Sequence, residues 1–195
     1  EELGMIATAH TNGDVCIYSI TEQDNGMTLG DLSGVWNPFT SRTYARSIAF
    51  VSMEKRGTPK HGVVVGGGNG QIWINDIDSF FSSSNNTPSL SFANKNAAKV
   101  QPDHTGPVIS LASRPGGIFV SVGHDGLLRV TDAWLGREDI KSSLMQEVSP
   151  LYGIGGGLKV WVGSVCIDEE GKRLISDGFD DAVVVHDFFA DDTDG

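Results

Sequence analysis

The chain has 195 residues, of which 39% are hydrophobic and 20% are charged, a composition typical of a folded protein rather than a disordered one. Its 25 acidic and 14 basic residues give a formal charge of -11, which repels nucleic-acid phosphates and anionic lipids, so neither is an expected partner. No apolar stretch approaches the roughly 20 residues that a membrane-spanning helix needs, so no membrane span is expected.

The first unit of the chain covers residues 1–44. Its apolar alternation predicts two strands joined by a tight hairpin and at most one short outer strand, at 4–9, 15–20 and 27–32. A loop that contains Trp36 and Phe39 follows the third segment.

The second unit, residues 45–100, and the third, residues 101–150, each contain alternating apolar runs that predict strands. In the second unit these runs are 45–52, 63–67, 71–76 and 89–92. In the third unit they are 108–112, 118–122, 127–132 and 145–148.

The fourth unit, residues 151–190, predicts strands at 160–168, 173–176 and 182–187, and it overlaps an acidic tail at 188–195. Residues 168–195 contain ten acidic and two basic side chains. This acidic segment is either a solvated surface or a docking site for a basic partner.

A turn signal recurs along the four units at spacings of 57, 56 and 55 residues. In each case two turn residues are followed at once by a short alternating apolar run; the pairs are Asn12-Gly13, Asn69-Gly70, Asp125-Gly126 and Asp180-Asp181. Seven residues after the turn opens, the first unit has Ser19 and the others have an aspartate: Asp76, Asp132 and Asp187. A regular period of this kind predicts a repeat fold in which each unit packs against its neighbours.

Each unit therefore offers three short antiparallel strands, and some offer a fourth. Small sheets that are apolar on both faces have to stack face to face, and radial stacking about an axis gives a β-propeller. We predict an all-β chain that forms a single partial propeller over 1–195. Its four blades lie at roughly 1–44, 45–100, 101–150 and 151–190.

The third unit resembles a blade of the WD-repeat family. His104-Thr105-Gly106 is similar to the family's Gly-His corner, Arg114-Pro115-Gly116-Gly117 to its Ser-Pro-Asp-Gly turn, and residues 124–132 to its strand-turn-strand segment that ends in Trp-Asp. In every unit another residue stands in place of the family's Trp: Tyr18, Asn75, Thr131 and His186. The repeats are also longer than the family's usual 40 to 45 residues.

The resemblance implies that Asp76, Asp132 and Asp187 are structural residues at strand ends, and that His104, Ser121 and Asp125 form a structural hydrogen-bonded network. A catalytic His–Asp–Ser group is the alternative for the network. The resemblance also implies a ring of seven or eight blades, so four are too few. Earlier blades missing at the N-terminus would complete the ring if the chain is the C-terminal portion of a larger propeller; a second chain is the alternative.

The function that the resemblance implies is a non-catalytic scaffold that binds protein partners within a larger complex. The candidate contact residues are loop aromatics that are expected to be exposed, although each could instead pack under its own loop: Trp36, Phe39, Phe80, Phe81 and Trp134. The alternative function is a propeller enzyme or a metabolite-binding protein with its site at the central channel.

No cofactor or metal is expected from the motifs. The five histidines lack metal-ligand spacing, and the glycine-rich segment 153–157 lacks the Lys-Ser/Thr ending of a phosphate loop. Segment 177–181 is rich in aspartate but lacks the spacing and the closing Glu of an EF-hand. Cys16 and Cys166 read as small buried side chains in a reducing compartment, which favours an intracellular protein of the cytoplasm or nucleus. Organelle targeting stays open, because the chain starts without Met.

Overall fold

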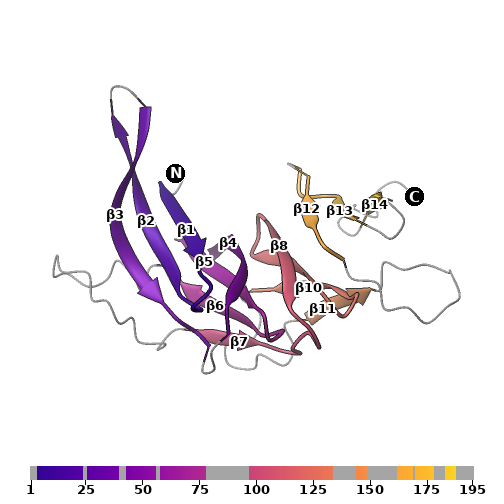
Figure 1. Ribbon diagram of the computed structural model, residues 1–195. Coiled ribbons are helices and arrows are strands. Elements are labelled where there is room, and N and C mark those ends of the chain that lie inside the picture. Colours follow the sequence, from indigo (N-terminus) through magenta and orange to yellow (C-terminus); the bar gives the residue numbers. More distant parts are fainter. Residues whose placement is uncertain are drawn as a thin grey trace, which may run out of the picture.

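Every regular element in the part of the chain that the structure describes is a β-strand, and these strands form four small antiparallel sheets. The structure is a computed structural model that describes residues 4–23, 26–39, 43–55, 58–77, 97–133, 144–148, 162–168, 170–177 and 183–187. The sheets follow one another in chain order along an arc (Figure 1). Within the described ranges the chain has no helix with the length and hydrophobicity of a membrane span.

The first and second sheets are built from the first seven strands. The first sheet has the order β1-β2-β3, with β1 at Met5–Ala9, β2 at Val15–Gln23 and β3 at Gly26–Trp36. The second has the order β4-β5-β6-β7, with β4 at Ala45–Lys55, β5 at Thr58–Gly67, β6 at Ile72–Asp76 and β7 at Ala98–Val100. Several strands are longer than the sequence predicts: β3 extends to Trp36, and β5 begins at Thr58, before the predicted start at residue 63. The short strand β7 was not predicted, and the predicted strand at 89–92 lies outside the described residues.

The third and fourth sheets follow in the same way. The third has the order β8-β9-β10-β11, with β8 at Val108–Arg114, β9 at Ile118–Gly123, β10 at Leu128–Asp132 and β11 at Leu144–Val148. The fourth has the order β12-β13-β14, with β12 at Val165–Ile167, β13 at Leu174–Asp177 and β14 at Val183–His186. Each sheet is thus formed by consecutive strands, as short hairpin connections favour.

The recurring turn has the same hydrogen bonds in the first three sheets. The side chain of Asn12, Asn69 or Asp125 accepts a hydrogen bond from the backbone N–H two residues later, at 3.1, 3.1 and 3.2 Å. The glycine that follows has a positive φ of 90°, 84° or 74°. Asn and Asp suit this turn because their short side chains bond the nearby backbone, and Gly suits it because it tolerates positive φ.

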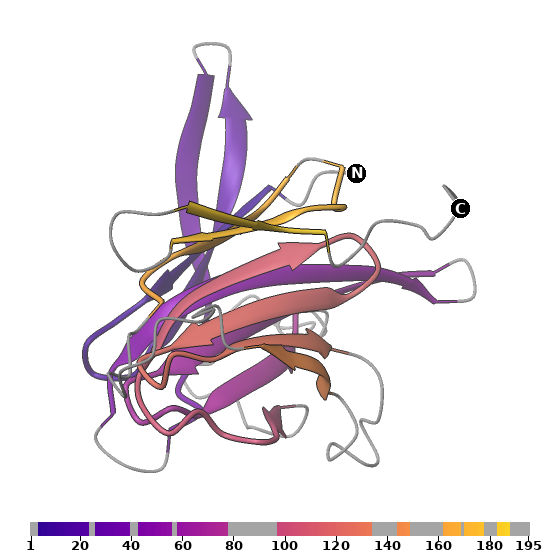
Figure 2. The same cartoon turned by 90° about the vertical axis from the view of Figure 1, so that its right-hand side faces the viewer.

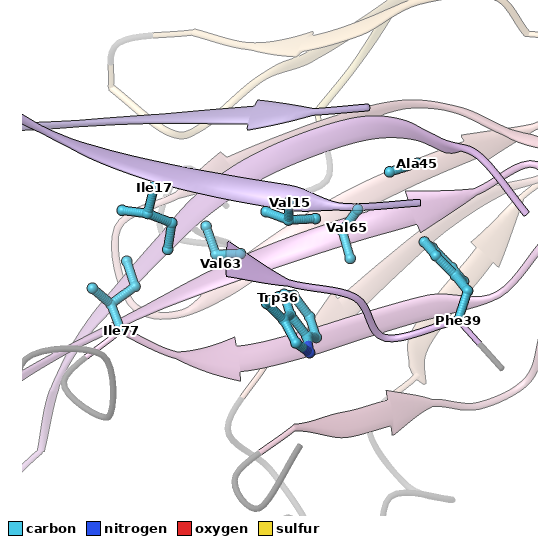
Figure 3. Packing of buried hydrophobic residues seen from close by; sticks show 8 residues of the cluster. All are labelled: Val15, Ile17, Trp36, Phe39, Ala45, Val63, Val65 and Ile77. Atoms are coloured by element: carbon cyan, nitrogen blue, oxygen red, sulfur yellow. The ribbon is translucent and has the colours of Figure 1, made fainter. Parts of the chain in front are cut away.

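Three apolar cores lie between successive sheets, so the sheets are stacked face to face. The first core joins the first and second sheets and is shown in Figure 3: Val15, Ile17, Trp36, Phe39, Ala45, Val63, Val65 and Ile77. The second joins the second and third sheets, and its members include Phe119 of β9 and Ile72 and Ile74 of β6. The third joins the third and fourth sheets, with Leu128 of β10 and Leu174 of β13 both fully buried.

The sheets contact one another mainly through their first strands. In the second, third and fourth sheets, β4 packs against β8, and β8 packs against β12. Figures 1 and 2 show the successive sheets as layers arranged along an arc. Four small antiparallel sheets stacked in this way are consistent with part of a β-propeller ring.

Backbone hydrogen bonds also join the turn of one sheet to the chain entering the next. The carbonyl of His10 accepts from Ala45 N–H at 3.0 Å, and the carbonyl of Gly70 accepts from His104 N–H at 3.0 Å. At Gly70 the approach is so close that a Cβ would overlap the carbonyl oxygen of His104. Glycine is therefore required here both by its φ and by the neighbouring sheet.

Gly70→Ala should lower the free energy of unfolding more than Gly116→Ala does. Both glycines have positive φ, so both variants carry the backbone strain of about 1–2 kcal/mol, but no atom lies within 4 Å of a Cβ at Gly116. The overlap at Gly70 should add at least about 1 kcal/mol. Urea unfolding of the two variants measures the difference; equal losses would contradict the close packing of the second and third sheets.

Candidate functional site

A buried chain of three polar side chains lies in the third sheet. His104 precedes β8, Ser121 is on β9, and Asp125 is in the turn between β9 and β10. The Nδ1 atom of His104 lies 2.9 and 3.0 Å from the two carboxylate oxygens of Asp125, and its Nε2 atom lies 2.9 Å from Ser121 Oγ. The structure therefore brings together the three residues that the sequence analysis groups.

The backbone holds this group in place. Besides His104, the carboxylate of Asp125 accepts hydrogen bonds from the N–H groups of Thr105 at 3.0 Å and Leu127 at 3.2 Å. Because His104 N–H also donates to the carbonyl of Gly70, the group ties the third sheet to the second. A carboxylate only accepts hydrogen bonds, so the proton on Nδ1 of His104 points to Asp125.

The environment of Asp125 stabilises its charged form. Burial on its own would raise the pKa of Asp125, but the hydrogen bond and positive charge of His104, together with the N–H groups of Thr105 and Leu127, outweigh burial and lower that pKa to about 2. The ordinary value is 3.8. The ionised carboxylate therefore stabilises the fold above pH 3.8, and this contribution is lost as the pH falls from there toward 2.

The Asp125–His104–Ser121 order matches the connectivity of an acid–base–nucleophile group. However, the side chains of His104 and Asp125 are 0% and 2% exposed, and Ser121 is completely buried on β9. A nucleophilic hydroxyl has to reach a substrate atom at about 3 Å, which this burial prevents. What the arrangement does is satisfy three buried polar groups and fix the corner of the sheet.

The fourth sheet contains a reduced version of this network. In the fourth sheet Ser176 is at the register position of Ser121, and its Oγ lies 3.3 Å from Nε2 of His186. Both side chains are buried, and burial lowers the pKa of His186. Cys166, on β12 of the same sheet, is exposed, contrary to the buried position expected from the sequence.

The three strand-end aspartates lie in different surroundings. Asp76 is buried at the end of β6, and Asp132 is half-buried at the end of β10. Asp187 is exposed and forms an ion pair with Arg173, with Arg173 Nε 3.2 Å from its Oδ1. The shared sequence position thus does not give these carboxylates the same exposure.

The structure corrects the expected exposure of two candidate contact aromatics. Trp36 is 1% exposed and Phe39 is buried, and both belong to the core between the first and second sheets (Figure 3). The reason is that β3 continues to Trp36, so that the segment expected as a loop is part of the sheet stack. Phe80, Phe81 and Trp134 lie outside the described residues.

Two other motifs can be followed only in part. The carboxylate of Asp177 accepts hydrogen bonds from the N–H groups of Gly163 and Ser164 at 2.9 to 3.0 Å, and segment 178–181 lies outside the described residues, as does the glycine-rich segment 153–157. In the described ranges no three His, Cys, Asp or Glu side chains gather in a way that could hold a metal ion.

A projecting hairpin is the feature that sequence reasoning missed. β2 and β3 extend together well beyond β1, and Figures 1 and 2 show them standing out from the sheet stack. Met27 and Leu29 on β3 are 74% and 60% exposed. The polar–apolar alternation of residues 27–32 signalled a strand, but the length of this arm follows from the pairing of β3 with all of β2.

The comparisons with known proteins support the fold alone. The chain is similar to a chain in the crystal structure of a mitotic checkpoint complex, with 18% identity and a TM-score of 0.61. The match covers 95% of this chain and 44% of that chain, so this chain spans less than half of its length. No family model and no curated protein matches the sequence.

Asp125→Asn should reduce the acid sensitivity of the fold. The native chain should lose about 1–2 kcal/mol more unfolding free energy than the variant between pH 4 and pH 2, because only the native chain has the carboxylate with the lowered pKa. Urea unfolding at several pH values measures this. Asp187→Asn is the control. Because the Asp187–Arg173 ion pair is exposed, this variant and the native chain should lose nearly the same unfolding free energy between pH 4 and pH 2.

Trp36→Ala should destabilise the chain by about 3–5 kcal/mol, because it removes a fully buried indole from the first core. Thermal and urea unfolding measure the loss, and Trp36→Phe should recover a large part of it. A variant that unfolds like the native chain would contradict the buried position of Trp36.

Proposed function

We propose that the chain is a WD-repeat scaffold that binds protein partners as a subunit of a larger complex and carries no catalytic centre. The observation that carries this proposal is the likeness of its stacked sheets to a chain of a multi-protein complex. The repeated turns and the His104–Ser121–Asp125 network support the WD-repeat assignment. As in other WD-repeat propellers, the ring would close at seven or eight blades.

The physical properties of the fold suit a scaffold. Sheets joined by three apolar cores and by backbone hydrogen bonds leave little freedom to lose on binding, so partner contacts cost little ordering entropy. The complete burial of Ser121 favours a structural role for the His104–Ser121–Asp125 network. With a formal charge of -11, the chain favours partners that present a basic surface.

Within this proposal, the projecting β2–β3 arm is the contact surface. Met27 and Leu29 are exposed apolar side chains on the same strand two residues apart, so they point to the same side of the arm. Neither belongs to an apolar core between sheets. Apolar side chains held out in water by an ordered hairpin are the groups that a protein partner can cover with a net gain in free energy.

The double variant Met27→Ser, Leu29→Ser should lose the partner and keep its stability. In affinity purification from cells of the source organism, proteins retained by the native chain should be depleted at least about tenfold with the variant, because the apolar contact is lost. Quantitative mass spectrometry of the eluates measures the depletion. The melting temperature should be unchanged, since both side chains are mostly exposed.

The matched control is Val183→Ser, Val185→Ser, which removes two exposed apolar side chains from another strand, β14. It should retain the same partners. An unchanged set of proteins with the arm variant would overturn the role of the arm. If native mass spectrometry showed a lone chain with a bound metabolite or metal, the alternative function at the central channel would be favoured instead.

A further inference from the structure

The outermost strand of the first sheet differs from the outermost strands of the next two sheets. β3 has 11 residues, whereas β7 has 3 and β11 has 5. β7 also contains Lys99, and β11 contains Glu147. Short strands and charged residues are common means by which a protein keeps the free edge of a sheet from pairing with another chain. The outer edges of the second and third sheets are therefore protected.

The long strand β3 has little of this protection. Its sequence contains no proline and no lysine, and its one charged residue is Asp31. β3 pairs with β2 on one side, and no described strand pairs with it on the other. Figure 1 shows it on the far side of β2 from β1. The outer edge of β3 is thus a long edge that is open to another strand.

The register of the first sheet shows which backbone groups of β3 point to this edge. The N–H of Ile20 in β2 donates to the carbonyl of Gly4, on the β1 side, at 2.6 Å. Leu29 lies opposite Ile20 in the antiparallel pair of β2 and β3. Because the N–H of Ile20 is turned away from β3, the two residues form a non-hydrogen-bonded pair, in which both turn their backbone groups away from each other. The N–H and C=O of Leu29 therefore point outward.

Met27 has the same orientation as Leu29. The register has no shift between these residues, and backbone direction alternates along a strand, so residues two apart turn the same way. Thr28, between them, turns its backbone groups toward β2, and its hydroxyl oxygen lies 2.9 Å from that of Thr21. The outer part of β3 thus presents two N–H and two C=O groups that bond no described strand.

These backbone groups determine what kind of structure fits the edge. A helix bonds its own N–H and C=O groups, so it has none to pair with those of β3. An added strand does pair with them, and its alternate side chains then pack on Met27 and Leu29, which are both mostly exposed. The occupant that matches both the backbone and the side chains is therefore an extended segment.

The charge of the chain favours a basic segment from a different protein. Asp31 is exposed on β3, and the whole chain has a formal charge of -11. A lysine or arginine of an added strand would be attracted to this carboxylate and to the surrounding negative field. The same charge opposes pairing between the arms of two copies of this chain.

We propose that the outer edge of β3 binds an extended segment of a protein partner, which joins the first sheet as an added strand. The segment has apolar residues at alternate positions and at least one lysine or arginine. This inference rests on the proposed function, since it specifies how the β2–β3 arm contacts its partner.

The test uses the whole chain and a phage-displayed library of random twelve-residue peptides. Selection should enrich peptides with alternating apolar residues, a basic residue and no central proline, because proline has no N–H to donate to the edge. At saturation, a synthetic peptide of the enriched sequence should slow the hydrogen exchange of the Met27 and Leu29 amides at least about tenfold. NMR measures this, and the amide of Ile72, inside the second sheet, should be unaffected.

A pair of variants separates backbone pairing from side-chain contact. Leu29→Pro removes an outward N–H without removing a hydrogen bond to β2, and a free strand edge tolerates proline at such a position. It should weaken binding of the selected peptide about tenfold or more. The control Leu29→Val keeps the N–H and an apolar side chain and should bind within about threefold of the native chain. Equal binding by both variants would overturn backbone pairing.

The exchange measurement on the native chain needs no variant, so it decides the proposal even if Leu29→Pro disturbs the arm. Enriched peptides that leave the amides of β3 unprotected, or a selection that enriches no peptide, would overturn the added strand. A mass of twice 20.8 kDa, with protected β3 amides in the absence of peptide, would show that the arms of two copies pair and would also overturn it.

The proposed function and this inference fail in different ways. If the Met27→Ser, Leu29→Ser variant loses its partners in the affinity purification but no peptide protects β3, the arm binds through side chains alone. The proposed function then stands, and the added strand is wrong. If the variant retains every partner, the role of the arm in the proposed function is wrong, whatever the peptides do.

Discussion

The structure depends on the burial of apolar side chains between one sheet and the next. Each sheet has only three or four short strands, too few to bury its own faces, so its stability comes from the sheets on either side. The three cores supply this burial. The backbone hydrogen bonds from the turns at His10 and Gly70 then fix the spacing, because they join each turn to the chain entering the next sheet.

The polar network of the third sheet follows from the same stacking. Once a sheet is covered on both faces, a polar side chain inside it has no water to bond and has to find partners in the protein. His104, Ser121 and Asp125 do so with one another, and Ser176 and His186 contact each other in the fourth sheet. The low pKa of Asp125 is a consequence of the hydrogen bonds that its carboxylate accepts, and it does not by itself indicate catalysis.

The surfaces left for binding are those that stacking does not use. One is the β2–β3 arm, whose strands continue past β1 and so have no neighbouring sheet along their outer part. Further exposed apolar side chains, Ile6, Val183 and Val185, lie on faces of the first and fourth sheets that no described sheet covers.

The sequence by itself determined the recurring turn and most of the strands beside it, because the Asn/Asp-Gly turn and the alternating run are local: the backbone N–H two residues after Asn69 donates to the Asn69 side chain. It also grouped His104, Ser121 and Asp125 by resemblance. Only the tertiary structure decided which apolar side chains are buried. Trp36 is covered and Val183 is exposed, although both look apolar in sequence, because burial depends on whether another sheet lies against that face.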